Sequence, residues 1–441
     1  MRISRTIETA VCLVALAMAL SATPALAAPA IDAAYRAQVR ELRADPRVQE
    51  ALQHIVALQA RSRRDLVELT EIPAPPFKEQ ARARRYAELL REAGLAAVRI
   101  DDVGNVIGRR PGRPGARVVA LSAHLDTVFP EGTDVTVRVE DGKMYAPGIG
   151  DNTRGLVTIL DVLRALQHAD IATQADVLFI GNVGEEGLGD LRGVKHLFRE
   201  GAPRIDTLIA VDGGRSDRIV YGGVGSHRYR VTFHGPGGHS WGAFGTANPH
   251  HALGRAIALF DQNAPSVTAG GVKSSYNIGR IGGGTSINSV PFDSWAEVDI
   301  RSGDPAKIDA IDAILLAAVE QALADENDGR SMGDPLTVDV ERVGTRPAAP
   351  GDAGVPVVQR AMAATRSFGI EPELAISSTD ANLPISMGIP AITMSRGGVS
   401  GNAHSPEEWW QDVDGHIGTQ VALVTLLAEA GLGGAGGAGH R

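Results

Sequence analysis

The sequence has almost no cysteine. Cys12 is the only one among 441 residues, and it lies in an N-terminal apolar segment that we expect to be removed. The mature chain would then have no thiol for catalysis, no disulfide and no cysteine metal ligand. Any metal ion that the protein holds must therefore be bound by nitrogen and oxygen atoms, as in histidine and carboxylate sites.

The chain also lacks a block of basic residues and any apolar run long enough to span a bilayer. The net charge is −9, so nucleic acid is not an expected partner. The apolar run from Ala10 to about Leu20 follows two arginines and precedes the small-residue site Ala25-Leu26-Ala27. This pattern predicts a signal peptide over residues 1–27 and a periplasmic or secreted protein, free of the membrane after cleavage.

Alternating apolar strands and helices indicate the fold class. Residues 28–221 begin with a helical stretch over 31–70 and continue as strand–helix alternation, which resumes over 344–432. This order predicts an α/β catalytic domain in two parts, with a mostly parallel sheet covered on both faces. Residues 222–343 between them read as four strands and two helices, an inserted α+β lid or dimerisation domain. The glycine-rich residues 433–441 are expected to form a disordered tail.

Histidine and acidic residues follow the expected strands, where open α/β sheets place their ligand sites. They are His124 and Asp126 in SAHLDTV, Asp151 in GIGDNTRG, Glu185 and Glu186 in VGEEGLGD, Asp212 in VDGG and His404 in NAHSPEEW. Each has an ordinary structural explanation by itself: a buried histidine, a helix cap, a solvated acidic loop, a turn or an exposed loop histidine. Their conjunction instead predicts ligands for two metal ions that share one bridging carboxylate.

The adjacent glutamates suggest a division of roles. Neighbouring side chains point apart, so Glu186 can ligate a metal ion while Glu185 faces a water molecule as general base. Nearby cations would hold both carboxylates ionised despite their mutual repulsion.

These motifs, in this order, resemble the di-zinc exopeptidases and deacylases, a family that includes glutamate carboxypeptidase, peptidase T, bacterial dipeptidases, aminoacylase and acetylornithine deacetylase. The resemblance extends from the turn EIPAPP to AHSPEEW. It implies two divalent metal ions, zinc first, with cobalt or manganese as substitutes. By similarity, one ion is bound by His124 and Asp212 and the other by His404 and Glu186. Asp151 bridges them, Asp126 orients His124, and Glu185 is the general base.

The resemblance also covers the inserted domain and implies a homodimer. His239 in GPGGHS resembles a histidine that stabilises the oxyanion, often in the partner subunit's site. Asn288 in GGTSINSVP and Arg301 in AEVDIRS resemble substrate-contacting residues. The alternatives are a plain turn at GPGGHS and a salt bridge on the sheet for Arg301. SSTDANLP resembles a pocket loop, in which Asp380 has no assigned role.

One ligand position bears on the activity. Asp212 stands where carboxypeptidase and deacylase members have glutamate, whereas the aminopeptidase and dipeptidase branch has aspartate. The sequence therefore predicts metal-dependent hydrolysis of small peptides by an aminopeptidase or di/tripeptidase. One alternative is a carboxypeptidase or an N-acyl amino acid deacylase. Another is a peptide-binding protein without catalysis, which the presence of Glu185 and every candidate ligand disfavours.

Overall fold

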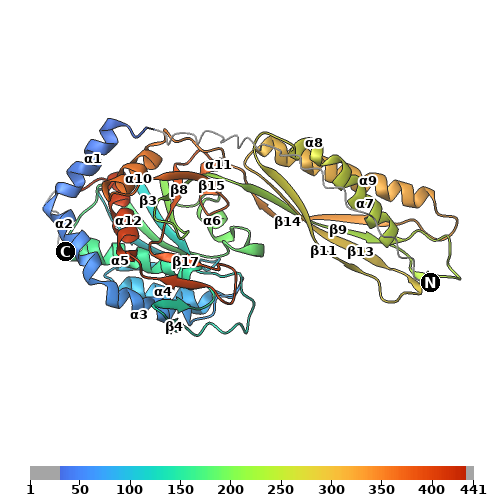
Figure 1. The fold of residues 1–441 in the computed structure, drawn as a ribbon, viewed down its shortest axis with the longest axis horizontal. Coiled ribbons are helices and arrows are strands. Elements are labelled where there is room, and N and C mark those ends of the chain that lie inside the picture. Colours follow the sequence, from blue (N-terminus) through green and yellow to red (C-terminus); the bar gives the residue numbers. More distant parts are fainter. Residues whose placement is uncertain (1–29, 434–441) are drawn as a thin grey trace, which may run out of the picture.

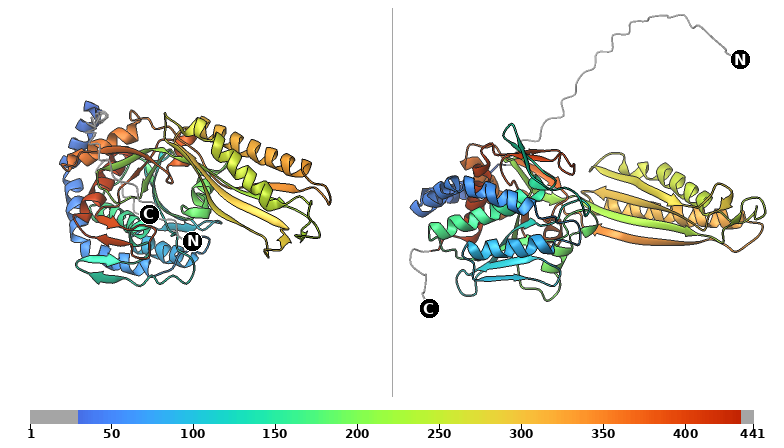
Figure 2. Two further views of the ribbon diagram at one scale, coloured as in Figure 1. Left: turned by 45° about the vertical axis from the view of Figure 1, so that its right-hand side comes forward. Right: turned by 90° about the horizontal axis from the view of Figure 1, so that it is seen from below.

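The computed structural model describes residues 30–433, so the expected signal peptide lies outside the described residues, as does the tail beyond Gly433. Two bodies are visible: a larger one, which contains both parts of the expected catalytic domain and keeps that name, and an elongated one, the expected lid, that projects from it (Figure 1). Both further views show the same projection (Figure 2). Within residues 30–433 no helix is both long and apolar enough to cross a membrane.

An eight-stranded sheet in the order β1-β2-β6-β3-β7-β16-β8-β15 forms the centre of the catalytic domain. The strands β6, β3, β7 and β16 run parallel, β1, β2 and β8 pair antiparallel to a neighbour, and β15 runs parallel to β8. Their bounds are β1 Ala97–Ile100, β2 Val106–Arg110, β3 Val118–His124, β6 Asp176–Asn182, β7 Thr207–Val211, β8 Arg218–Gly223, β15 Glu373–Ser377 and β16 Ala391–Met394. The inner strands are buried along most of their length, as expected for a sheet covered on both faces.

One face of this sheet is covered by α4 (Gln80–Glu92), α5 (Gly155–His168), α10 (Pro356–Ser367) and α12 (Gly415–Ala430). An outer layer of α1 (Ala33–Ala44), α2 (Pro46–Ala57) and α3 (Gln59–Thr70) packs on these helices (Figure 1). The helical stretch expected over 31–70 is thus three helices. Its first break lies at Asp45, whose carboxylate caps α2 while Pro46 occupies the first helical position. The short helices α6 (Arg192–Leu197) and α11 (Asn382–Ser386) contribute to a smaller apolar cluster over other residues of the sheet.

The lid has its own antiparallel sheet, in the order β11-β13-β9-β14. Its elements are β9 Gly225–His234, α7 Pro249–Asn263, α8 Pro265–Thr268, β11 Ser274–Gly283, β13 Asp293–Ser302, α9 Pro305–Asp328 and β14 Thr337–Arg346. Alternate residues of β13 are buried, and α7 and α9 cover that face (Figure 1). Phe233, Phe260 and Ile311 are fully buried there, so the lid has a hydrophobic core separate from that of the catalytic domain.

Two smaller sheets complete the fold. One joins β10 (Gly238–His239) to β12 (Ser289–Val290) in the lid. The other has the order β17-β18-β5-β4, built from β4 (Arg138–Glu140), β5 (Lys143–Tyr145), β17 (Val399–Gly401) and β18 (Trp409–Gln411). This second sheet joins segments from the two parts of the catalytic domain.

Candidate metal centre

Three candidate segments meet because their strands are neighbours. The sheet order places β3 between β6 and β7, and all three run parallel. His124 ends β3, Glu185 and Glu186 follow β6, and Asp212 follows β7, so the side chains meet at one edge of the sheet.

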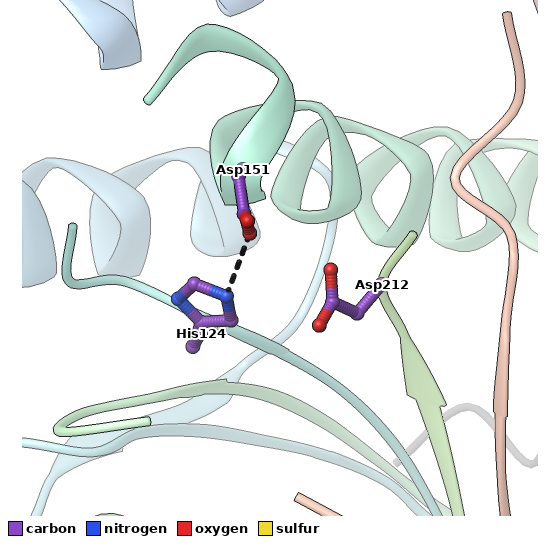
Figure 3. Close-up of side chains that lie close together, drawn as sticks. All are labelled: His124, Asp151 and Asp212. Carbon is purple, nitrogen blue, oxygen red and sulfur yellow. Dashed lines mark hydrogen bonds and ion pairs between the residues drawn. The ribbon is translucent and has the colours of Figure 1, made fainter. Parts of the chain in front are cut away.

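Asp151 lies at the centre of the cluster. It belongs to the distorted helical turn Ile149–Arg154 that leads into α5. Its Oδ1 is 3.2 Å from Nε2 of His124, and its Oδ2 is 3.4 Å from Nε2 of His404. The other contact of the His404 imidazole is Glu186, whose Oε1 is 3.0 Å from Nε2. Figure 3 shows His124, Asp151 and Asp212 pointing toward one another from three different elements.

These donors form two sets that share Asp151. One is His124, Asp151 and Asp212, the other Asp151, Glu186 and His404, and in each set the ligand atoms lie within 4.8 Å of one another. Imidazole nitrogen and carboxylate oxygen are donors that suit zinc, cobalt or manganese. The five predicted ligands are therefore brought together in an arrangement that fits two cations bridged by one carboxylate.

The charges in the cluster shift one another's pKa. Burial opposes charge on His124, but its hydrogen bond to Asp151 and nearby carboxylates raise its pKa well above the usual value. Hydrogen bonds to Asp151 and Glu186 raise the pKa of His404 to about 10. Burial would raise the pKa of Asp151, but its bonds to both imidazoles hold it well below the usual range. The positive charge of the protonated imidazoles thus balances the negative charge of the carboxylates, a role that bound cations would take over.

Glu185 is buried and held by one cation. Nη1 of Arg346 donates to Oε1 of Glu185 over 2.9 Å and to Oγ of Ser378 over 3.0 Å, and Nη2 donates to the Glu185 carbonyl oxygen. Burial raises the pKa of Glu185 well above its usual value, and Arg346 opposes this shift only in part. A buried carboxylate with a raised pKa is suited to accept a proton near neutral pH.

Asp126 contributes in a way that differs from the prediction. Nδ1 of His124 donates to the main-chain carbonyl of Asp126 over 3.0 Å, while the nearest carboxylate oxygen of Asp126 is 3.7 Å away. That carboxylate instead accepts hydrogen bonds from the main-chain N–H groups of Glu185 (3.1 Å) and Glu186 (2.8 Å). The residue therefore orients His124 through its backbone and fixes the glutamate loop through its side chain.

Three buried charged residues near the centre were not identified from the sequence. Arg396 donates from Nη1 to Oδ1 of Asp212 over 2.9 Å, and Glu408 accepts three main-chain hydrogen bonds from the segment that ends at Asp151. The third is Arg346, at the end of β14. Two signals were available in the sequence: Arg396 follows the apolar strand β16, and Glu408 lies in the motif AHSPEEW.

The centre opens into a cleft of about 1140 Å³. Arg301 and Arg228 line this cleft and share Asp299, with Nε–Oδ distances of 2.6 and 3.2 Å. Asp380 is buried, accepts from Nδ2 of Asn182 over 2.8 Å, and has its pKa raised by burial to about 7.

His239 and Asn288 are not brought to this cleft, which they do not line within the described part of the chain. Pairing of β10 with β12 sets them side by side in the lid, where the N–H of Ser240 donates to the Asn288 carbonyl over 2.9 Å. His239 is exposed there.

The sheet, the lid and the clustered imidazoles and carboxylates define a metal-dependent hydrolase. A family model described as peptidase family M20/M25/M40 matches residues 120–429, and the chain belongs to this family. The predicted family, α/β fold class and hydrolysis of peptide bonds with the aid of metal are thereby confirmed.

Individual relatives support this assignment. The chain is 26% identical over 335 residues to the uncharacterized protein YqjE of Bacillus subtilis (strain 168), covering 74% of this chain and 85% of that protein. It is 24% identical over 362 residues to carboxypeptidase G2 of Pseudomonas sp. (strain RS-16), covering 78% and 82%. The crystal structure of aminopeptidase PepT from Bacillus cereus ATCC 10987 matches with a TM-score of 0.66 and 25% identity, covering 84% of this chain and 98% of that one.

Proposed function

We propose that the protein is an exported aminopeptidase or di/tripeptidase that uses two divalent metal ions, zinc in the first place. The observation that carries this proposal is the position of Asp151, whose two carboxylate oxygens each face one imidazole. A carboxylate placed in this way can bridge two cations while His124 and His404 bind one each. When bound, such ions would lower the pKa of a water molecule and polarise the scissile carbonyl group.

The chain's own residues supply the proton transfers. Glu185 takes the proton from water as the oxygen attacks the carbonyl carbon, and then gives it to the amine nitrogen as the carbon–nitrogen bond breaks. Arg346 holds Oε1 of Glu185, so the second carboxylate oxygen is the one that carries the proton. Asp126 keeps the loop that bears the general base at a fixed distance from His124.

A second candidate, a carboxypeptidase or N-acyl amino acid deacylase, is favoured by a different observation. Arg228 and Arg301 line the cleft, and guanidinium groups suit a substrate carboxylate. The aspartate at position 212 and the likeness to an aminopeptidase favour the first candidate. Both candidates hydrolyse an amide bond of a small substrate.

One assay separates the candidates. The mature chain, loaded with zinc, is given free dipeptides, N-acetylated amino acids and N-blocked dipeptides at equal concentration. An aminopeptidase or dipeptidase cleaves the free dipeptides far faster than either blocked substrate. Activity confined to the blocked substrates would instead support the second candidate, and no hydrolysis of any of them would reject both.

We further propose a homodimer in which the lid contributes to the partner's cleft. Trp241 and Phe244 are 88% and 85% exposed next to His239, an unusual position for two large apolar side chains. An interface would cover them and carry His239 toward a second copy's centre, where it would stabilise the oxyanion. Sedimentation of the wild-type protein and of Trp241→Glu tests this: the first should be a dimer and the second a monomer.

The cellular location is likewise a proposal that depends on the N-terminal residues. Export with cleavage after Ala27 predicts a mature chain that begins at Ala28. N-terminal sequencing of the protein from a periplasmic or culture fraction measures this directly, and an intact N-terminal Met1 in that fraction would contradict it.

A further inference from the structure

Glu408 is a fully buried carboxylate whose hydrogen bonds all go to one short segment. Its Oε2 accepts from the N–H of Gly148 over 2.8 Å, and its Oε1 accepts from the N–H groups of Gly150 (2.9 Å) and Asp151 (2.7 Å). The residue is only 1% exposed. Hydrogen bonds from amides to a carboxylate are about twice as strong as neutral ones, so this side chain holds the turn that ends at Asp151.

The same residue is joined through the backbone to the other ligand loop. Glu408 lies four positions after His404 and directly before β18. Residues Trp409 and Trp410 of β18 pair with Tyr145 and Met144 of β5, and the N–H of Ala146 donates to the Glu408 carbonyl over 3.1 Å. Because β5 runs into the turn that carries Asp151, this register sets the Asp151 and His404 segments opposite each other.

The glycines of the turn show that the fit at Glu408 is close. A Cβ atom at Gly150 would lie 2.9 Å from Oε1 of Glu408 and 3.3 Å from Nη2 of Arg396. Gly148 has a φ of 76° and no room for a side chain, because its Cβ would lie 2.5 Å from Cγ2 of Thr127. Glycine at position 150 therefore lets the main chain approach the carboxylate, and glycine at position 148 gives the turn the positive φ and the space beside Thr127 that it needs.

We propose that Glu408 is a positioning residue that fixes the separation of Asp151 and His404 and thereby sets the affinity of the centre for metal. This inference depends on the metal assignment made above. Asp151 can face both imidazoles only if its backbone is held in place relative to the His404 loop, and Glu408 is the side chain that links the two. Loss of a residue that orients metal ligands typically weakens metal binding by about 10- to 100-fold.

The test compares Glu408→Gln with a matched neighbour. An amide of the same shape cannot accept the three hydrogen bonds with the strength of a carboxylate. Glu407→Gln is the control, since Glu407 is 67% exposed and its contact is a surface ion pair with Arg138 at 3.1 Å. Zinc dissociation constants are measured by competition with a chromophoric chelator, and the cobalt-substituted proteins are compared by their visible absorption spectra.

We expect zinc binding to be weakened by about 10- to 100-fold in Glu408→Gln, with an altered cobalt spectrum, and to be unchanged in Glu407→Gln. Should Glu408→Gln be insoluble, Glu408→Asp carries the same test, because it keeps the charge but is too short by one methylene group to reach all three amides. Wild-type affinity and a wild-type cobalt spectrum in the folded variant would overturn the role of Glu408. Failure of the wild-type protein to bind zinc would overturn the metal assignment itself, and this inference with it.

Discussion

Replacing Glu185 with glutamine should separate catalysis from metal binding. The substitution removes the group that accepts the proton, and loss of a general base typically lowers turnover by about 10²- to 10⁴-fold. None of the proposed ligands is changed, so the zinc content should stay at the wild-type level. The assay is kcat and kcat/KM on the best substrate, together with elemental analysis of the same preparation.

The same substitution has a stability consequence that follows from Arg346. Removing one member of a buried ion pair costs about 3–5 kcal/mol, because the other charge stays buried without its partner. The glutamine oxygen can still accept from Arg346, which also donates to Ser378 and to the residue 185 carbonyl. We therefore expect the lower end, about 3 kcal/mol, in urea unfolding of the metal-free protein.

A double variant tests the origin of that loss. In Glu185→Gln/Arg346→Met no charge is left unpaired, so its loss of stability should be smaller than the sum of the two single losses. Additive losses would contradict the buried ion pair. Wild-type turnover in Glu185→Gln would remove Glu185 from the mechanism, whatever its effect on stability.

Four further predictions concern the metal centre and the lid. Zinc binding should tighten as pH rises between 6 and 8, because the pKa of His124 is raised and that of His404 is about 10, so zinc must displace a proton from each imidazole. The expected gain is about tenfold per pH unit for each proton displaced. Titrations with zinc at several pH values measure this. In the metal-free protein, protonated His404 should contribute to stability because its pKa is raised in the folded state. This contribution should be complete below about pH 6.5 and be lost as pH rises through about 10. Melting temperatures across this range check it. Asp151→Asn should weaken the binding of both zinc ions together, so that neither of the two equivalents is held with wild-type affinity. Loss of one equivalent while the other is retained would contradict a bridging role. Phe260→Ala should destabilise the lid by about 3–5 kcal/mol, measured by urea unfolding, while zinc content stays unchanged.

The meeting of these side chains was predictable from the sequence because of where parallel strands end. His124, Glu186 and Asp212 each follow an apolar strand, and parallel strands that are neighbours bring their carboxyl ends to one edge. This argument needs only a mostly parallel sheet, which the strand–helix alternation predicts. It also places Asp151 and His404 nearby, as residues of loops on the same edge.

The residues that support these ligands could not be found in this way. Arg346 reaches Glu185 across 161 residues, Arg396 reaches Asp212 across 184 and Glu408 reaches Asp151 across 257. Arg346 looks in the sequence like any exposed arginine, Glu408 has no assigned role within the motif AHSPEEW, and only tertiary packing shows that all three residues are buried. The small sheet that joins β5 to β18 was missed for a related reason, since strands of three residues are too short to show alternation.

The charges of the site explain why two guanidinium groups accompany its acids. Arg346 neutralises Glu185, which is not a proposed ligand, and Arg396 takes Oδ1 of Asp212 and leaves Oδ2 for a metal ion. The carboxylates of Asp151 and Glu186 and the Oδ2 atom of Asp212 then remain to bind cations. Two divalent ions would more than balance these ligands, so the ions with their ligands would be positive when loaded, while the carboxylates of Asp126 and Glu408 accept main-chain N–H bonds behind them. Such a centre favours the negative charge that develops on a carbonyl oxygen as its carbon becomes tetrahedral. On the proposed mechanism the arginines therefore do more than stabilise buried acids: they would leave Glu185 for proton transfer and the other carboxylates for metal binding.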